Sequence, residues 1–328
     1  MSDPVRQIAD AVLYEGYILW PYRRSAMKNA QRWTFGGVYP RAWSEAGHPD
    51  DRSLMQAQVL VLGSAPAVDV QVRFLHVVRR QLLLDGEPVD ELVVDGERHI
   101  SWEEASEREL GPGPVAIAGG REEEPLGPTG SVVRSWLKLE GSVDVSTETL
   151  RDDLHRVTVR ILNTTPFAGS REQALEQTLC SCHAVLRASP GAEFVSLTDP
   201  PAELREEAAA CVNDGVWPVL VGEPHERGTV LASPIILEDH PRVAPESPGD
   251  LFDGGEIDQM LVLNILALTD EEKEEMRASD PKAREILERT EALTNEELMR
   301  LNGAIRDLSA PMPALRQDRA GSSRGPGG

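Results

Sequence analysis

The feature that most constrains this chain is the alternation of apolar and polar residues between positions 56 and 165. In VDVQVRFLHVV, residues 68–78, the alternating apolar positions are Val68, Val70, Val72 and Phe74. A period of two places successive side chains on opposite faces of an extended strand, so this segment predicts a half-buried antiparallel strand. Two more alternating strands are predicted at 131–146 and 155–165. A short apolar strand is predicted at 56–64, and a buried strand bounded by Pro and Gly at 217–224.

Three segments between these strands are less regular. An Asp95-Gly96 turn joins two short strands, and the acidic segment after them predicts a short helix or an irregular edge. Residues 119–130, GGREEEPLGPTG, hold four glycines and two prolines and predict a loop. Residues 170–188 place Ala174, Leu175 and Leu179 at helical spacing and predict a helix.

Helix signals also lie near both ends of the chain. Helices are predicted at 4–14, 26–32 and 201–212. Further helix starts are the capping boxes at 253–256, 269–272 and 293–298 and the Asp280-Pro281 pair. Residues 253–297 carry fourteen acids and five bases, which indicates acidic helices. Residues 309–328 have no apolar periodicity and are predicted to be disordered.

These patterns predict an α+β protein with a central, sandwich-like antiparallel β region, a wrapped N-terminal segment and acidic C-terminal helices. The predicted division is an aromatic and basic segment at 1–48, a β-rich domain at 49–250, a helical region at 251–308 and a tail at 309–328. We identify no internal repeat.

Composition narrows the class of partner and the compartment. The chain of 328 residues has a formal net charge of −22, which opposes the binding of nucleic acid as the main partner. No apolar stretch reaches the roughly 18 residues of a membrane span, and acids occupy the N-terminus where a signal peptide is basic. The three cysteines are too few for a disulfide framework. We therefore expect a cytoplasmic protein without a membrane span.

The N-terminal region gathers aromatic and basic residues. Residues 14–43 hold eight of the fifteen aromatic residues, and no Asp or Glu lies within 17–43. The bases of 17–43 are Arg23, Arg24, Lys28, Arg32 and Arg41. Such a segment favours a protein interface, but packing over the sheet and a small anionic ligand are alternatives. We expect Trp20 and Tyr17 to be buried, and Arg24 and Arg32 to point outward. The predicted partner-binding residues are Tyr22, Arg23, Arg24, Lys28, Arg32 and Trp33.

Cys180, Cys182, His183 and Cys211 are residue types that bind zinc or iron. On a helix, however, the sulfurs of Cys180 and Cys182 would point about 200° apart, because each residue turns roughly 100°. Free cysteines are also among the most often buried residues. A structural role is favoured for these thiols, and no cofactor is predicted.

The segment 233–258 is rich in acids and prolines and contains one histidine. A carboxylate-rich loop of this kind suits a divalent metal or general acid catalysis, but several of its acids fit helix caps instead. An ordered structural or docking loop is the favoured interpretation. The residues predicted for the metal alternative are Asp239, His240, Glu246 and Asp250.

No nucleotide-binding or hydrolase motif is present: the sequence lacks Gly-x-Gly-x-x-Gly, the P-loop, Gly-x-Ser-x-Gly and His-Glu-x-x-His. Two segments, LYEGYILWPYRRSAMKNAQRWTFGGVYPRAWSE and VLASPIILEDHPRVAPESPGDLFDGGEIDQMLVLNILALTDEEK, resemble a family of uncharacterised bacterial proteins. In actinobacteria notably, these proteins are encoded beside nickel-iron hydrogenase genes. The resemblance covers about a quarter of the chain and carries over no catalytic residue.

The resemblance implies an accessory or docking protein of hydrogenase assembly or function, which is non-enzymatic and binds a hydrogenase subunit or maturation factor. The alternative is a metal-dependent hydrolase or maturation enzyme that uses the 233–258 loop.

Overall fold

The computed structural model describes residues 4–33, 35–242, 251, 258–294 and 297–298. Their contacts divide the chain into two units, Met1–Ala292 and Leu293–Gly328. In the second unit, Thr294 and Glu297 form the predicted capping box, because Thr294 N donates to Glu297 Oε2 at 2.8 Å and Glu297 N donates to Thr294 Oγ1 at 3.3 Å. All that follows concerns the first unit.

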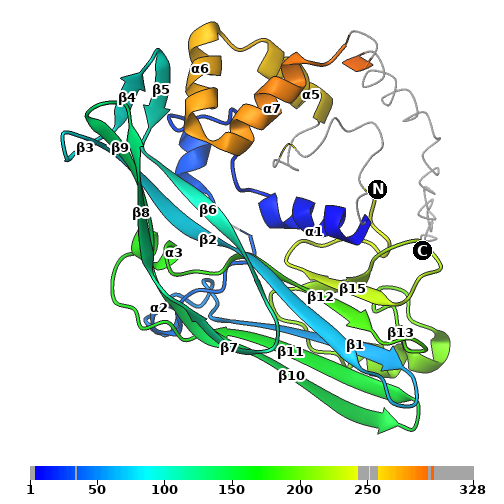
Figure 1. The fold of residues 1–328 in the computed structure, drawn as a ribbon. Coiled ribbons are helices and arrows are strands. Elements are labelled where there is room, and N and C mark those ends of the chain that lie inside the picture. Colours follow the sequence, from blue (N-terminus) through cyan, green and yellow to red (C-terminus); the bar gives the residue numbers. More distant parts are fainter. Residues whose placement is uncertain (1–3, 34, 243–250, 252–257, 295–296, 299–328) are drawn as a thin grey trace, which may run out of the picture. The chain divides into compact units, whose positions relative to one another are not determined.

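Two antiparallel sheets dominate the described residues of this unit, as the alternating pattern predicts (Figure 1). The five-stranded sheet runs in the order β13 (Glu193–Phe194), β1 (Leu54–Leu62), β11 (Leu154–Asn163), β10 (Leu139–Arg151) and β7 (Gly113–Ile117). The path of the eight-stranded sheet is β14 (Trp217–Leu220), β15 (Thr229–Ser233), β12 (Cys180–Ala188), β2 (Val68–Leu84), β9 (Gly130–Trp136) and β8 (Gly120–Leu126).

The strand β2 organises the larger sheet. It also pairs with β3 (Glu87–Val89) and with β6 (Trp102–Leu110). A hairpin of β4 (Glu91–Val94) and β5 (Glu97–Ile100) lies between these two strands in the sequence. The predicted Asp95-Gly96 turn is confirmed, with both residues at positive φ.

One apolar cluster joins the two sheets. Phe74 of β2 and Leu186 of β12 belong to it together with Val59 of β1 and Val157 of β11, and all four are buried. Within one strand, every second residue belongs to the cluster: Val70, Val72 and Phe74 on β2 are an example, as a period of two requires. The core of the unit therefore draws on both sheets.

Helices flank the sheets. The unit contains α1 (Pro4–Tyr14), α2 (Arg41–Glu45), α3 (Arg171–Leu175), α4 (Arg205–Ala209), α5 (Asp258–Leu266), α6 (Asp270–Ser279), α7 (Pro281–Glu291) and the 3₁₀ turns η1 (Met27–Gln31) and η2 (Ala202–Leu204). Ala9 and Val12 of α1 pack against Val185 of β12 and Leu231 of β15. In Figure 1, α5, α6 and α7 lie together at one end, beside the β4–β5 hairpin. None of the described helices is long and apolar enough to cross a bilayer.

The predicted helix at 170–188 is wrong for most of its length. Only Arg171–Leu175 are helical, and Cys180–Ala188 form strand β12. The strand β12 pairs with β2 on one side and with β15 on the other, and this pairing outweighs the helical spacing of so short a segment. Ser181 sits at a register shift with φ 50°, which places an irregularity within the CSCH motif.

The predicted loop at 119–130 and the helix or irregular edge after residue 101 are also strands, β8 and β6. Their acids pair across the sheet with arginines: Glu124 with Arg134 at 2.8 Å, and Glu104 with Arg80 at 2.7 Å. Such cross-strand ion pairs offset the low strand propensity of glutamate.

Other predictions of local structure are confirmed. The helix at 4–14 is present, and the capping box of residues 269–272 opens α6. Asp280 caps α7 ahead of Pro281. The capping box at 253–256 and the tail at 309–328 lie outside the described residues.

Candidate arginine-lined pocket

The N-terminal segment, residues 15–33, is held by the C-terminal helices of its own chain. The Tyr17 hydroxyl donates to Asp280 Oδ2 at 2.6 Å, and both residues are buried. The Tyr22 hydroxyl donates to the carbonyl of Leu251 at 2.5 Å. Burial and the Asp280 carboxylate raise the pKa of Tyr17 well above its usual value, which keeps the hydroxyl a donor.

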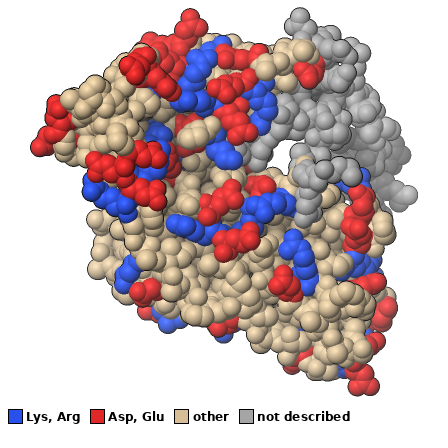
Figure 2. Space-filling view, viewed as in Figure 1, with Lys and Arg blue, Asp and Glu red and all other residues tan. Residues whose placement is uncertain are grey.

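Acids of the chain neutralise much of the positive charge of this segment. Arg23 pairs with Glu272 of α6 at 3.0 Å, and Arg24 with Asp90 at 3.3 Å. The backbone N–H of Ser25 donates to Glu275 at 3.0 Å. Figure 2 accordingly shows basic and acidic side chains interspersed over the end of the molecule that holds α6 and α7.

Arg32 is the most enclosed cation of the segment, with 5% of its surface exposed. Its guanidinium carbon lies 4.0 Å from the ring centre of Trp102 and 4.7 Å from that of Trp33, which are cation–π distances. Its Nη2 donates to the carbonyl of Glu103 at 2.5 Å. Desolvation lowers the pKa of Arg32, but a guanidinium stays charged at neutral pH.

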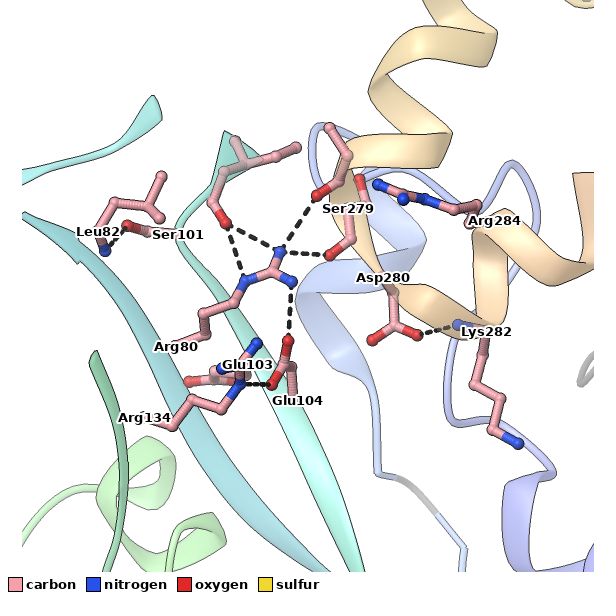
Figure 3. A network of polar contacts seen from close by, with 12 residues as sticks. Arg80, Leu82, Ser101, Glu103, Glu104, Arg134, Ser279, Asp280, Lys282 and Arg284 are labelled. Atoms are coloured by element: carbon pink, nitrogen blue, oxygen red, sulfur yellow. Dashed lines mark hydrogen bonds and ion pairs between the residues drawn. The ribbon is translucent and has the colours of Figure 1, made fainter. Parts of the chain in front are cut away.

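Arg80 fixes the sheet to the corner between α6 and α7, and Figure 3 shows it at the centre of a polar network. Its Nη2 donates to the carbonyls of Ser279 at 2.7 Å and Ala278 at 3.1 Å. Its Nε donates to the carbonyl of Ile100 at 3.1 Å, and its Nη1 to Glu104 at 2.7 Å. This one side chain therefore joins β2, β5, β6 and α6.

A pocket of about 310 Å³ opens where the N-terminal segment meets this network. It is lined by Arg24, Asn29, Arg32, Arg79, Arg80, Gln81, Asp90, Ser101, Trp102 and Glu103. Four arginines and two acids are thus among its described lining residues. We call this site the arginine-lined pocket. Its chemistry suits the recognition of a carboxylate or phosphate group, since guanidinium groups bind both in a bidentate manner.

The predicted partner-binding residues divide into two groups. Tyr22, Arg32 and Trp33 are buried, so the expectation that Arg32 points outward is wrong. Its long side chain gains more from stacking between aromatic rings than from water. Arg24 and Lys28 are exposed.

The other expectations for this segment have mixed outcomes. Arg23 is partly buried in its ion pairs with α6. Tyr17 is buried, as predicted, whereas Trp20 is only half-buried.

The residues predicted for the metal alternative are only partly described. Asp239 accepts hydrogen bonds from Thr198 Oγ1 at 2.7 Å and from Leu220 N at 2.8 Å, which anchor the end of β14. The backbone N–H of His240 donates to the Leu220 carbonyl at 2.7 Å. Glu246 and Asp250 lie outside the described residues. Within the described residues, no group of three or more His, Cys, Asp or Glu side chains is placed to hold a metal ion.

The cysteines occupy apolar surroundings. Cys180 and Cys182 are buried, and Cys211 is half-buried. Desolvation raises the pKa of Cys180 to about 12 and also raises that of Cys182, which disfavours the thiolate that metals require. Cys182 belongs to the apolar cluster between the sheets.

The sequence reasoning missed Arg79, Arg80 and Trp102. The adjacent arginines interrupt the apolar run FLHVVRRQLLL, and this was the available signal, because a charge inside a central strand needs a partner. No sequence pattern marks Trp102 as a site residue, because its contact with Arg32 joins residues that are 70 positions apart.

Comparisons with known proteins add no relative: no protein-family model matches the chain, and no curated protein matches it.

Proposed function

We propose that this chain is a non-enzymatic docking protein that contacts a partner protein through residues 24–28, which we call the docking turn. The observation that carries this proposal is the exposure of Met27. It is 88% exposed, the highest value among the large apolar residues that the structure describes as exposed. Arg24 and Lys28 flank it and are also exposed. Methionine and arginine are enriched where proteins meet other proteins.

The docking turn is held in place by its neighbours. Arg24 N donates to Ser279 Oγ at 3.3 Å, and Ser25 N donates to Glu275 at 3.0 Å. The buried side chain of Asn29 accepts from Leu19 N at 2.8 Å and donates to the Arg23 carbonyl at 3.0 Å. A turn ordered before binding loses little further entropy on association, which favours affinity.

The scaffold of this proposal is a sandwich-like pair of sheets, supported by the apolar cluster that Phe74 and Val157 share across them. The resemblance to proteins encoded beside nickel-iron hydrogenase genes makes a hydrogenase subunit or maturation factor the proposed partner, in the cytoplasm. No contact of the described residues favours the hydrolase alternative. Asp239 and the backbone of His240 instead form hydrogen bonds with Leu220, the last residue of β14.

The test is co-expression of the full chain with the nickel-iron hydrogenase subunits and maturation factors of the same organism, followed by affinity purification. Met27→Ala should weaken retention of the partner by about 1–2 kcal/mol, roughly 5- to 30-fold, if Met27 is an anchor. The melting temperature should stay nearly unchanged, because an exposed side chain contributes little to stability.

Met260→Ala is the matched control, since Met260 lies on α5 and is 51% exposed. It should leave retention unchanged. An equal loss in both variants, or retention that is independent of Met27, would contradict the docking turn. Failure of the wild-type chain to retain any of these proteins would remove the hydrogenase assignment.

A further inference from the structure

The strand β10 is paired on both sides for only part of its length. It lies between β11 and β7, but β7 pairs only with Leu139–Val143, whereas β11 pairs as far as Arg151. In Figure 1, β10 runs along the lower border of the five-stranded sheet. Among the described strands, none pairs with residues 144–150 on the side away from β11. We call this stretch the free edge of β10.

The hydrogen bonds of the sheet show which backbone groups point outward at the free edge. Thr164 N donates to the carbonyl of Glu140 at 2.9 Å, so the even-numbered residues of β10 bond to β11. In an antiparallel ladder, the residues between them point to the opposite side. Up to the register shift that follows Thr149, the outward N–H and carbonyl groups are therefore those of Val145, Thr147 and Thr149.

Two other sheet edges are protected in ways that this edge is not. Pro125 interrupts the outer strand β8, and proline is a common device against the pairing of sheet edges. In the outer strand β14, the Leu220 N–H donates to Asp239, and its carbonyl accepts from the backbone of His240. The free edge of β10 contains neither proline nor lysine, and residues 146–149 are exposed. It is thus a ready template for a further strand.

The side chains along the free edge define what would fit there. Val145 packs at the border of the apolar cluster between the sheets and is only half-buried. Asp144 points to the opposite face and accepts from Ser142 Oγ at 2.7 Å. Glu148 pairs with Arg156 at 3.1 Å, whereas no described Lys or Arg forms an ion pair with Asp144. An added strand would therefore gain most from an apolar residue beside Val145 and an adjacent base beside Asp144.

A second copy of the chain fits this edge poorly. The outward groups are centred on Thr147, so a two-fold axis would place Thr147 opposite its own copy and Val143 of the copy near Arg151. Because β7 of the copy pairs with that Val143 through Gly113, it would run into Arg151 and the turn that follows. An extended segment that carries no neighbouring strand meets no such obstacle.

We propose that the free edge of β10 is a docking site for an extended segment of a partner protein. The segment adds to the five-stranded sheet as a further strand and carries an apolar residue next to Lys or Arg. In this mode of recognition, the main-chain hydrogen bonds give affinity and the alternate side chains give specificity. The proposal goes beyond the docking turn, because it concerns a different strand and does not depend on Met27.

The test is fluorescence anisotropy of a labelled peptide that alternates valine and lysine over about eight residues, which matches the length of the free edge. Titration with the full chain should show saturable binding of one peptide per chain. Thr147→Pro should weaken binding at least about tenfold, because it removes an outward N–H and blocks strand addition. Its melting temperature should change little, since this N–H does not bond to β11. Thr147→Val keeps the N–H and should bind like the wild type.

Asp144→Asn tests the side-chain part of the proposal without altering the backbone. It should weaken binding of the valine–lysine peptide severalfold, whereas Glu122→Gln, at an exposed acid of the outer strand β8, should not. Met27→Ala should leave the peptide affinity unchanged, so this proposal and the docking turn fail separately. A dimer in sedimentation that Thr147→Pro disrupts would assign the edge to a second copy instead. Absence of saturable binding, or equal affinity of Thr147→Pro and Thr147→Val, would overturn the site.

Discussion

The charge of Arg80 is largely removed from water, with 11% of the side chain exposed, and its guanidinium forms hydrogen bonds with several polar neighbours. The side chain reaches the carbonyls of Ile100, Ala278 and Ser279, and its Nη1 bonds Glu104. Taking an ion out of water is costly, and the cost is offset only when its hydrogen bonds are satisfied. Loss of this side chain would remove a donor from three carbonyls and would leave Glu104 with Arg134 as its remaining cation, at 2.9 Å.

Arg80→Met should therefore lower the free energy of unfolding by about 2–4 kcal/mol, somewhat less than the loss expected for one partner of a fully buried pair, because both side chains keep some exposure. Urea unfolding followed by circular dichroism measures this change. Arg121→Met is the control, because Arg121 on β8 is 60% exposed and pairs only locally with Glu123. That substitution should change stability by less than about 0.5 kcal/mol. A loss below about 1 kcal/mol in Arg80→Met would show that the network in Figure 3 contributes little.

Two buried histidines should make stability depend on pH. His76 and His183 are each 0% exposed, and desolvation lowers the pKa of both from 6.5 to about 4. Between these pH values the unfolded chain binds protons that the folded chain does not bind. Stability is therefore fully present above pH 6.5 and is lost as the pH falls toward 4, by on the order of 3 kcal/mol per histidine.

His76→Leu isolates this effect. The stability of the variant should fall by on the order of 3 kcal/mol less than that of the wild type between pH 6.5 and pH 4, because the unfolded chain then gains one proton fewer. Urea unfolding at a series of pH values measures the difference. His225→Gln, at an exposed position, should follow the wild-type curve. Parallel curves for His76→Leu and the wild type would show that His76 titrates alike in both states.

At the scale of elements, the sequence predicts helix starts well, because they depend on neighbouring residues. It predicts some strands poorly, because they depend on hydrogen bonding to strands that are distant in the sequence. The capping box of α6 and the Asp280 cap of α7 depend on residues two or three positions apart, and both are present. The strands β6 and β8 carry glutamates that fit poorly with strand propensity. Arginines on the neighbouring strands stabilise them, and no one-dimensional pattern contains that pairing.

The cap of α6 gives a prediction at this scale. Thr269 Oγ1 accepts from Glu272 N, and Glu272 Oε2 accepts from Thr269 N at 2.9 Å. Thr269→Ala should lower the free energy of unfolding by about 1 kcal/mol, because it leaves the Glu272 N–H without its acceptor. Thr269→Asp keeps an acceptor and should stay close to the wild type. Equal stability of the alanine and aspartate variants in thermal unfolding would show that the cap is not needed.

At the scale of the whole molecule, the basic and aromatic N-terminal segment contacts the acidic C-terminal helices and the β2–β6 pair. Tyr17 meets Asp280, and Arg23 meets Glu272, over sequence separations of about 250 residues. The sequence shows both charge clusters, but it cannot show that they pair with each other, because nothing local encodes so distant a contact. For the same reason the arginine-lined pocket, which draws on both β2 and the segment, was not predicted as a site.

The most direct test of this arrangement is a double-mutant cycle between Tyr17 and Asp280. Tyr17→Phe removes only the hydroxyl, and Asp280→Asn keeps an oxygen that can accept from Lys282 N at the start of α7. Unfolding free energies of the wild type, both single variants and the double variant should give a coupling of about 1–3 kcal/mol, since the pair is buried. Additivity within about 0.3–0.5 kcal/mol would contradict the docking of the N-terminal segment on the C-terminal helices.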